Sequence, residues 1–387
     1  RWISKLMALC LAVVMTLSMS MTVFAAISPS TTGTITVNGL DEGTVVTAYK
    51  ETTADAFKSF WHDMAAAIKD GTINMTGTES DPVAQEADSV TFTNMAMGEY
   101  LLTANGGVKV YQPTTAPLVP KYVEGDGWSL ENASANMKGE KPTIGKEGST
   151  EEEDTTVAVG DVVNLKLTVV VPDYPEDAKA ARMEVADTLS SGLTYNNDVK
   201  VYSDENLENE VTSGAATYTI TEDPATYTFQ LVFAKDYILN NGGKTIYVAY
   251  SATVNENAFD TDALGNKAFL GYNNDPYEDS SFHPDQGETE EDVYTYGIKI
   301  LKENEAGTEN LSGAEFKLYE NDTTGNPLKF VGANGVYTYT KVSGDDTLTV
   351  AGDGSLQIQG LDEGTYVLKE TKAPDGYVLP NGEITIQ

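Results

Sequence analysis

The segment 366–377 carries a carboxylate at a position where strand periodicity predicts a core side chain. Alternation places Tyr366, Leu368 and Glu370 on one face of a strand, which residues 374–376 end in a turn. A buried carboxylate is costly unless a partner satisfies it. Glu370 is therefore either an acid paired inside a core or a solvated side chain at the fraying end of an edge strand.

The segment 296–302 offers the cation that a buried Glu370 would require. Ile298, Ile300 and Lys302 fall on alternate positions and share one face, whereas Lys299 is out of phase with them. We therefore expect Lys302, rather than Lys299, to point toward Glu370.

Three further polar residues lie on apolar strand faces in the middle of the chain, namely Lys146, Asp187 and Asn266. The residues two positions away on those faces are apolar: Ile144, Val185, Leu189 and Ala268. Taken singly, each is better explained in the plainer way, as a surface lysine, a turn-flanking aspartate and a strand-end asparagine. Together, they would bring an amine, a carboxyl group and a carboxamide into one core.

The elements that must position these residues are short segments in which apolar and polar residues alternate. These segments are rich in Thr, Val and Tyr, and Gly, Asn and Asp separate them. This pattern is typical of β-sandwiches. In segment 162–171, Val163, Leu165 and Leu167 face one way and Lys166 faces the other. The exception is the segment from Thr53 to Lys69, whose aromatic and aliphatic residues recur at helical spacing and predict one helix packed on a core. The expected fold class is all-β, with tandem immunoglobulin-like sandwiches.

The motif Tyr-x-Leu-x-Glu-Thr-x-Ala-Pro-x-Gly-Tyr around Glu370 resembles the penultimate strand of the Cna protein B-type (SpaA-like) domains of Gram-positive pilins and adhesins. The resemblance implies that Glu370 is the catalytic acid of a spontaneous isopeptide bond made by Lys302. It also implies that the partner Asn or Asp, and a sorting signal, follow the segment 383–387. We therefore expect Lys302 and Glu370 to face each other without a bond in residues 1–387.

Four motifs in the middle of the chain resemble, in order, the fimbrial isopeptide-formation domain: Pro-Thr-Ile-x-Lys, Val-Gly-Asp, Asp-Thr-Leu-Ser-x-Gly-Leu and Asn-x-Ala-x-Leu-x-Tyr. The resemblance implies an isopeptide bond between Lys146 and Asn266, with Asp187 as the acid. Burial can make such a lysine neutral and nucleophilic, and it can keep the neighbouring carboxyl protonated. The carboxyl group then polarises the amide and returns a proton to the departing ammonia.

A lysine for linkage between subunits lies in the segment Ala-Pro-Leu-Val-Pro-Lys-Tyr, which ends at Tyr122. This segment resembles the pilin motif of sortase-assembled major pilins, with Val-Pro-Lys in place of Tyr-Pro-Lys. The resemblance implies that Lys121 is joined to the next subunit. Lys109 is the alternative, and an ordinary solvated lysine is the plainer interpretation of Lys121.

If the first and third domains are related, the first lacks the acid that the third carries. Segment 91–104 aligns with segment 356–370, and Ala104 stands where the third domain has Glu370. We therefore expect no internal cross-link in the first domain.

The composition and the amino-terminal segment indicate a secreted protein. Residues 1–25 combine basic residues, an apolar run and a small-x-small cleavage site, as in a secretory signal peptide, and they contain the single cysteine. The chain opens on Arg, so we expect that a preceding start is missing. A net charge of −35 disfavours nucleic acid and anionic lipid as partners. The expected domains are 26–138, 139–290 and 291–387, with segment 275–292 as an acidic connector before the third domain.

These expectations together describe the shaft subunit of a surface pilus on the cell wall, with a pilin-specific sortase and neighbouring pilin subunits as partners. The alternative is a monomeric cell-wall adhesin that uses the same domains as a stalk and binds a host surface ligand. A secreted hydrolase is disfavoured because no nucleophile-elbow, zinc-protease, P-loop or calcium-loop motif is present. We expect no cofactor, no metal and no enzymatic turnover beyond the self-modification.

Overall fold

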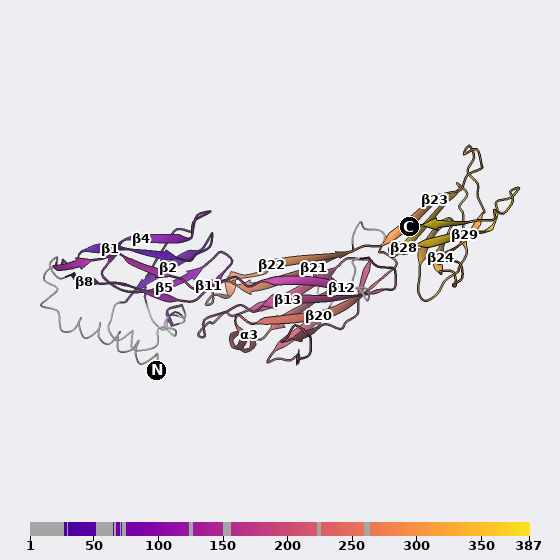
Figure 1. The fold of residues 1–387 in the computed structure, drawn as a ribbon. Helices are drawn as coiled ribbons and strands as arrows, with labels where there is room; N and C mark the ends of the chain where they lie inside the picture. Colours follow the sequence, from indigo (N-terminus) through magenta and orange to yellow (C-terminus); the bar gives the residue numbers. More distant parts are fainter. Residues whose placement is uncertain are drawn as a thin grey trace.

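The computed structural model describes residues 27–28, 30–51, 65, 67–69, 71, 75–123, 127–149, 156–222, 226–258 and 264–387. Strands dominate these ranges, and the all-β fold class is confirmed. Three pairs of sheets follow one another along a single long axis (Figure 1). The expected signal peptide lies outside the described residues. Within them, no helix combines the length and the apolar character that crossing a membrane requires.

The first domain is a sandwich of a three-stranded and a four-stranded sheet, in the orders β10-β1-β4 and β3-β2-β5-β7. Apolar residues from both sheets, including Ile35, Val46 and Leu102, form its core. Two short pairs, β11-β6 and β8-β9, complete it. Its strands are β1 (Thr32–Asn38), β2 (Val45–Lys50), β3 (Gly77–Glu79), β4 (Ser89–Ala96), β5 (Gly98–Asn105), β6 (Val110–Tyr111), β7 (Thr114–Leu118), β8 (Pro120–Val123), β9 (Gly127–Leu130), β10 (Ala133–Asn136) and β11 (Gly139–Glu140).

The helix expected over residues 53–69 is described only in part. Ala65 and residues 67–69 are helical, and the other positions, Trp61 among them, lie outside the described residues. Ala65 is fully buried and packs with Tyr49, Leu101 and Tyr277. The described part of this helix therefore contributes to a core, as its apolar spacing predicts.

The middle domain contains the largest core, which lies between the sheets β12-β13-β20-β16-β17 and β18-β19-β14-β21-β22. Strict alternation in β13, where Val163, Leu165 and Leu167 are buried, turns one face of the first sheet toward this core. The strands are β12 (Ile144–Ser149), β13 (Val162–Val170), β14 (Met183–Leu189), β15 (Leu193–Tyr195), β16 (Lys200–Tyr202), β17 (Glu210–Val211), β18 (Tyr218–Glu222), β19 (Phe229–Phe233), β20 (Thr245–Val254), β21 (Leu264–Asn273) and β22 (Phe282–Val293).

Two features of the middle domain differ from the sequence-based expectations. A seven-residue helix, α3 (Lys235–Asn241), packs on the core through Ile238, and a 3-10 turn, η3 (Asp279–Ser281), precedes β22. Helix α3 is too short to show a helical period. The acidic segment 275–292 is not a connector, because most of it forms β22, a twelve-residue edge strand paired with β21. An edge strand leaves many of its side chains in water, so polar composition does not exclude it.

The third domain is a sandwich of two four-stranded sheets, β23-β28-β26-β25 and β27-β24-β29-β30. Phe316, Ile358 and Leu368 lie in its core. The strands are β23 (Tyr296–Leu301), β24 (Glu315–Glu320), β25 (Phe330–Ala333), β26 (Val336–Tyr339), β27 (Leu348–Thr349), β28 (Ser355–Leu361), β29 (Tyr366–Lys372) and β30 (Glu383–Ile386).

The joint between the first and middle domains is held by buried polar groups of the middle domain. Tyr272 Oη donates to the Val108 carbonyl at 2.6 Å, and Asn274 Nδ2 donates to the Gly107 carbonyl at 2.9 Å. Asn105 Nδ2 donates to Asp275 Oδ2 at 3.0 Å. Because these three bonds join backbone and buried side chains across the joint, they fix how the two domains sit against each other.

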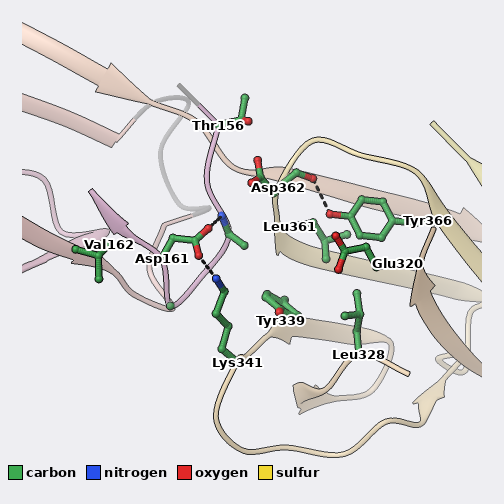
Figure 2. Close-up of a pocket in the computed structure, with 12 residues that line it drawn as sticks. Thr156, Asp161, Val162, Glu320, Leu328, Tyr339, Lys341, Leu361, Asp362 and Tyr366 are labelled. Carbon is green, nitrogen blue, oxygen red and sulfur yellow. Dashed lines mark hydrogen bonds and ion pairs between the residues drawn. The ribbon is translucent and has the colours of Figure 1, made fainter. Parts of the chain in front are cut away.

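A partly open pocket of about 330 Å³ lies at the joint between the middle and third domains. Figure 2 shows the ion pair between Asp161 and Lys341 that crosses this joint. The backbone amide of Val159 also donates to the Gly360 carbonyl at 3.0 Å. Gly360 has a φ of +75° and leaves no room for a Cβ beside Val159, so a glycine is required there.

Candidate functional site

The two sheets of the middle domain bring Lys146, Asp187 and Asn266 together. Lys146 lies on the edge strand β12, opposite Leu167 of β13. Asp187 and Asn266 lie on neighbouring strands of the other sheet, β14 and β21, with Asn266 opposite Leu189. The lysine therefore reaches across the core from one sheet to the other.

The lysine and the aspartate form an ion pair that is fully shielded from solvent. Lys146 Nζ lies 3.0 Å from Asp187 Oδ2, and the exposed fraction of both side chains is 0%. Lys146 Nζ also donates to the backbone carbonyl of Asn266 at 2.8 Å. Asn266 is 1% exposed. The amine is thus held beside the residue whose carboxamide would be its target.

A fourth residue, Tyr250, joins this group and was not predicted from the sequence. It lies on β20, and its hydroxyl donates to Asp187 Oδ2 at 2.6 Å. The same hydroxyl accepts a hydrogen bond from Asn266 Nδ2 at 3.1 Å. In the sequence, Tyr250 alternates with Val248 and Ala252 and is indistinguishable from a core aromatic residue. The one clue is general: a tyrosine on a core-facing position buries its hydroxyl, and a buried hydroxyl usually needs a hydrogen-bond partner.

Two oxygens of this site have no hydrogen-bond partner among the described residues. They are Asp187 Oδ1 and Asn266 Oδ1, and both are buried. Unpaired buried oxygens are costly and mark places where a proton can be accommodated. A proton on Asp187 would turn one carboxyl oxygen from an acceptor into a donor.

Burial acts on both ionisable groups of the pair. It lowers the pKa of Lys146, while the nearby Asp187 carboxyl works in the opposite direction. Burial raises the pKa of Asp187, against the opposing effects of Lys146 and the Tyr250 hydrogen bond. Each group therefore favours its neutral form more than it would in water, so passing one proton from the amine to the acid costs less here than in water.

The third domain holds a second pair of lysine and carboxylate, Lys302 and Glu370. Lys302 Nζ lies 2.9 Å from Glu370 Oε2, with side-chain exposures of 24% and 5%. Lys302 follows β23 directly, and Glu370 lies on β29 of the facing sheet. Glu370 Oε1 is buried without a hydrogen-bond partner in the described part of the chain. The two residues face each other, as expected from the alternation of side chains along their strands.

The first domain places its two candidate linkage lysines differently. Lys121 lies on β8, within the β8–β9 hairpin, and its side chain is 64% exposed beside Glu131 at 3.3 Å. Figure 1 shows β8 at the end of the molecule away from the middle domain. Lys109 is half-buried and donates to the Gly39 carbonyl at 3.3 Å, next to the joint with the middle domain. Ala104, in contrast, is a core residue.

The described residues contain no group of three or more His, Cys, Asp or Glu side chains arranged to hold a metal ion. Both buried pairs instead combine one lysine with one carboxylate. Such a pair can exchange a proton and, with a carboxamide beside it, can exchange an amide nitrogen.

Comparisons with known proteins agree with this architecture. Residues 296–387 match the family model of the SpaA prealbumin-like fold domain. The chain is 25% identical over 440 residues to the trypsin-resistant surface T6 protein of Streptococcus pyogenes serotype M6, covering 96% of this chain and 75% of that protein.

Solved structures of pilins share the fold. The T6 backbone pilin of S. pyogenes matches with a TM-score of 0.69 and 21% identity, over 93% of this chain and 81% of the other. The major pilins SpaD and SpaA of Corynebacterium diphtheriae match with TM-scores of 0.57 and 0.58 at 20% and 17% identity. The match with SpaD covers 93% of this chain and 92% of the SpaD chain, and the match with SpaA covers 91% of this chain and 94% of the SpaA chain. The chain is thus similar to the T6 surface protein over nearly its whole length, matches the SpaA prealbumin-like domain over residues 296–387, and has the fold of Gram-positive major pilins.

Proposed function

We propose that this chain is the shaft subunit of a covalently polymerised surface pilus. The observation that carries the proposal is the solvent-shielded contact of Lys146 with Asp187, beside Asn266. The similarity to a backbone pilin over nearly the whole chain supports the same function. Pulling on such a shaft loads each domain in series, and a covalent bond between the two sheets of a domain would resist that load.

The proposed chemistry is a single self-modification. Lys146 gives a proton to Asp187 and becomes a neutral nucleophile, which attacks the side-chain carbonyl carbon of Asn266. A new C–N bond forms, Asp187 passes its proton to Asn266 Nδ2, and Asp187 then takes the second proton from the lysine nitrogen. The bond from the carbonyl carbon to Asn266 Nδ2 breaks, ammonia leaves, and Asp187 ends protonated. Fixed proximity supplies much of the acceleration, because effective molarities in oriented sites reach about 10⁵–10⁸ M.

Linkage between subunits is proposed to use Lys121. Its side chain is exposed on a hairpin at one end of the molecule, where a sortase could deliver the neighbouring subunit. Lys109, at the joint between domains, is less accessible. The proposed partners are therefore a pilin-specific sortase and further copies of this chain, and the proposed location is the cell surface.

Intact-mass measurement of the secreted chain tests the intradomain bond. Each bond removes one ammonia, so the mass should fall by about 17 Da for each site that has reacted. Tryptic digestion should yield a joined peptide that contains residues 146 and 266. Lys146→Met should restore the full mass, whereas Lys166→Met, on the neighbouring strand, should leave the loss intact. A wild-type chain of full mass would refute the proposed cross-link.

A monomeric adhesin is the second candidate, because an elongated stalk would use the same domains. Expression in a sortase-bearing Gram-positive host separates the two. A shaft pilin gives a ladder of high-mass species that resist boiling in detergent, and an adhesin gives a single anchored band.

A further inference from the structure

We propose that Tyr250 is a catalytic residue of the cross-linking reaction, carrying the proton from Asp187 to the departing amide nitrogen of Asn266. This inference rests on the proposed function, because it concerns how that bond forms. It assigns a role to a buried hydroxyl that the reaction scheme above leaves unused.

The contacts of the hydroxyl place it between the acid and the leaving group. Tyr250 Oη lies 2.6 Å from Asp187 Oδ2 and 3.1 Å from Asn266 Nδ2. Among the hydrogen bonds of the described residues, Asp187 is connected to the amide nitrogen only through this hydroxyl. A proton that Asp187 receives from the lysine therefore has a continuous path to Nδ2 through Tyr250.

The surroundings of the ring hold the hydroxyl in this position. Tyr250 is 3% exposed, and its ring packs edge-on against Phe229 with a centroid distance of 4.9 Å. A side chain packed in this way cannot turn its hydroxyl into solvent without leaving the core. Burial and the neighbouring Asp187 also raise the pKa of the phenol, so Tyr250 keeps a proton and acts as a relay rather than as a base.

The proton transfers balance without any added reagent. Lys146 starts as an ammonium ion and first gives a proton to Asp187, which makes the amine neutral. After the amine attacks, the tetrahedral centre loses a second proton from the lysine nitrogen as its Asn266 nitrogen gains one. In this second transfer, Asp187 gives its proton to Tyr250 Oη while Tyr250 gives its own proton to Nδ2. Asp187 then takes the proton from the lysine nitrogen, the C–Nδ2 bond breaks and ammonia leaves.

The relay requires the hydroxyl to reverse its direction once. In the resting site, Tyr250 donates to Asp187 and accepts from Nδ2. Once Asp187 is protonated, it becomes the donor, and the tyrosine hydrogen can turn to the nitrogen, whose lone pair is freed in the tetrahedral centre. Both neighbours of the hydroxyl therefore change hydrogen-bonding role at the step in which the relay is needed.

Tyr250→Phe tests the proposal, because it removes the hydroxyl and keeps the ring. Freshly synthesised full-length chain is sampled over time, and the loss of about 17 Da is followed by intact mass. General acid–base groups typically contribute 10²–10⁴-fold, so we expect the reaction to slow by about 10²-fold or more. The matched control is Tyr174→Phe, which removes another buried phenol of this domain, one that donates to the Arg182 carbonyl at 2.9 Å. The control should mature at the wild-type rate.

A third chain, with 3-fluorotyrosine at position 250, separates proton transfer from packing. It keeps the hydroxyl and nearly the same shape, so it should mature close to the wild-type rate, with a pH–rate profile displaced by the more acidic phenol. If Tyr250→Phe fails to fold, this profile carries the test, and an unchanged profile would overturn the relay. Wild-type maturation speed in a folded Tyr250→Phe chain would overturn it as well. Absence of the mass loss in the wild type would instead refute the cross-link itself.

Discussion

Lys146 Nζ lies 3.0 Å from Asp187 Oδ2, although neither side chain is exposed to solvent. The two residues come from facing sheets, the lysine from the edge strand β12 and the aspartate from the central strand β14. Burial disfavours the charged form of each residue, so transfer of a proton from the amine to the carboxylate costs less here than in water. A structural salt bridge has no need of a carboxamide beside it, and here the carboxamide of Asn266 is linked to Asp187 through the Tyr250 hydroxyl.

The cross-link should add considerable stability to the middle domain. Residues 146 and 266 are separated by 120 positions. By analogy with a disulfide, closing a loop of this length stabilises the fold by about 5 kcal/mol through the lost entropy of the unfolded chain. We expect Lys146→Met to lower the free energy of unfolding by roughly this amount in guanidinium titrations.

The matched control for that loss is Lys166→Met. Lys166 pairs with the exposed Glu147 at 3.0 Å, and such surface pairs contribute about 0–1 kcal/mol. Equal stability losses for the two variants would show that the cross-link adds nothing.

The stability of an Asp187→Ala chain should rise with pH. This variant should cross-link very slowly, and it leaves Lys146 buried without its carboxylate. Burial lowers the pKa of Lys146 in the folded state below its usual value of 10.5, so the unfolded chain binds more protons between these two values. Folding is therefore favoured as the pH rises toward 10.5, by at most about 1.4 kcal/mol per pH unit. Urea titrations from pH 7 to pH 10 measure the slope.

The double variant Asp187→Ala, Lys146→Met provides the reference for that slope. It lacks the titrating amine and should show a flatter profile over the same range. Identical profiles for the single and double variants would mean that Lys146 keeps its ordinary pKa in the folded chain.

Lys121→Ala should stop polymerisation and leave the subunit folded. The side chain is exposed and touches only Glu131 among the ion pairs described, so its removal should change stability by less than about 0.5 kcal/mol. The measurement is the high-mass ladder on the surface of a sortase-bearing host. Lys109→Ala is the matched control and should keep the ladder. The reverse result would assign the linkage to Lys109.

Lys302→Met should destabilise the third domain. The substitution leaves Glu370, which is 5% exposed, without its cation, and an unsatisfied buried acceptor costs about 1–3 kcal/mol. Hydrogen exchange of the β29 amides should therefore accelerate. Lys299→Met, at an exposed position of β23, is the control and should leave exchange unchanged. Equal protection in both variants would show that the pair does not support the domain.

The sequence was sufficient for the strand faces. In β13 and β21, the residues predicted to point inward are buried, Asn266 among them. In β14, Val185 and Asp187 are buried as predicted, whereas Leu189 at the strand end is half-buried. This succeeds because the direction of a side chain in a strand depends on its own backbone, which alternates with a period of two. The sequence failed for β22, because an edge strand can carry acidic residues in water, and for α3, because seven residues show no period.

The partners of the buried polar groups were decided by the tertiary structure. Nothing near Tyr250 in the chain distinguishes it from a core aromatic residue. Its hydroxyl contacts Asp187 and Asn266 only because the sheet that bears Tyr250 packs against the sheet that bears those two residues. The exposure of Lys121 and the half-buried state of Lys109 likewise follow from where the hairpin and the domain joint lie. Local periodicity sets the face of a residue, but the order and register of distant strands set what it meets across the core.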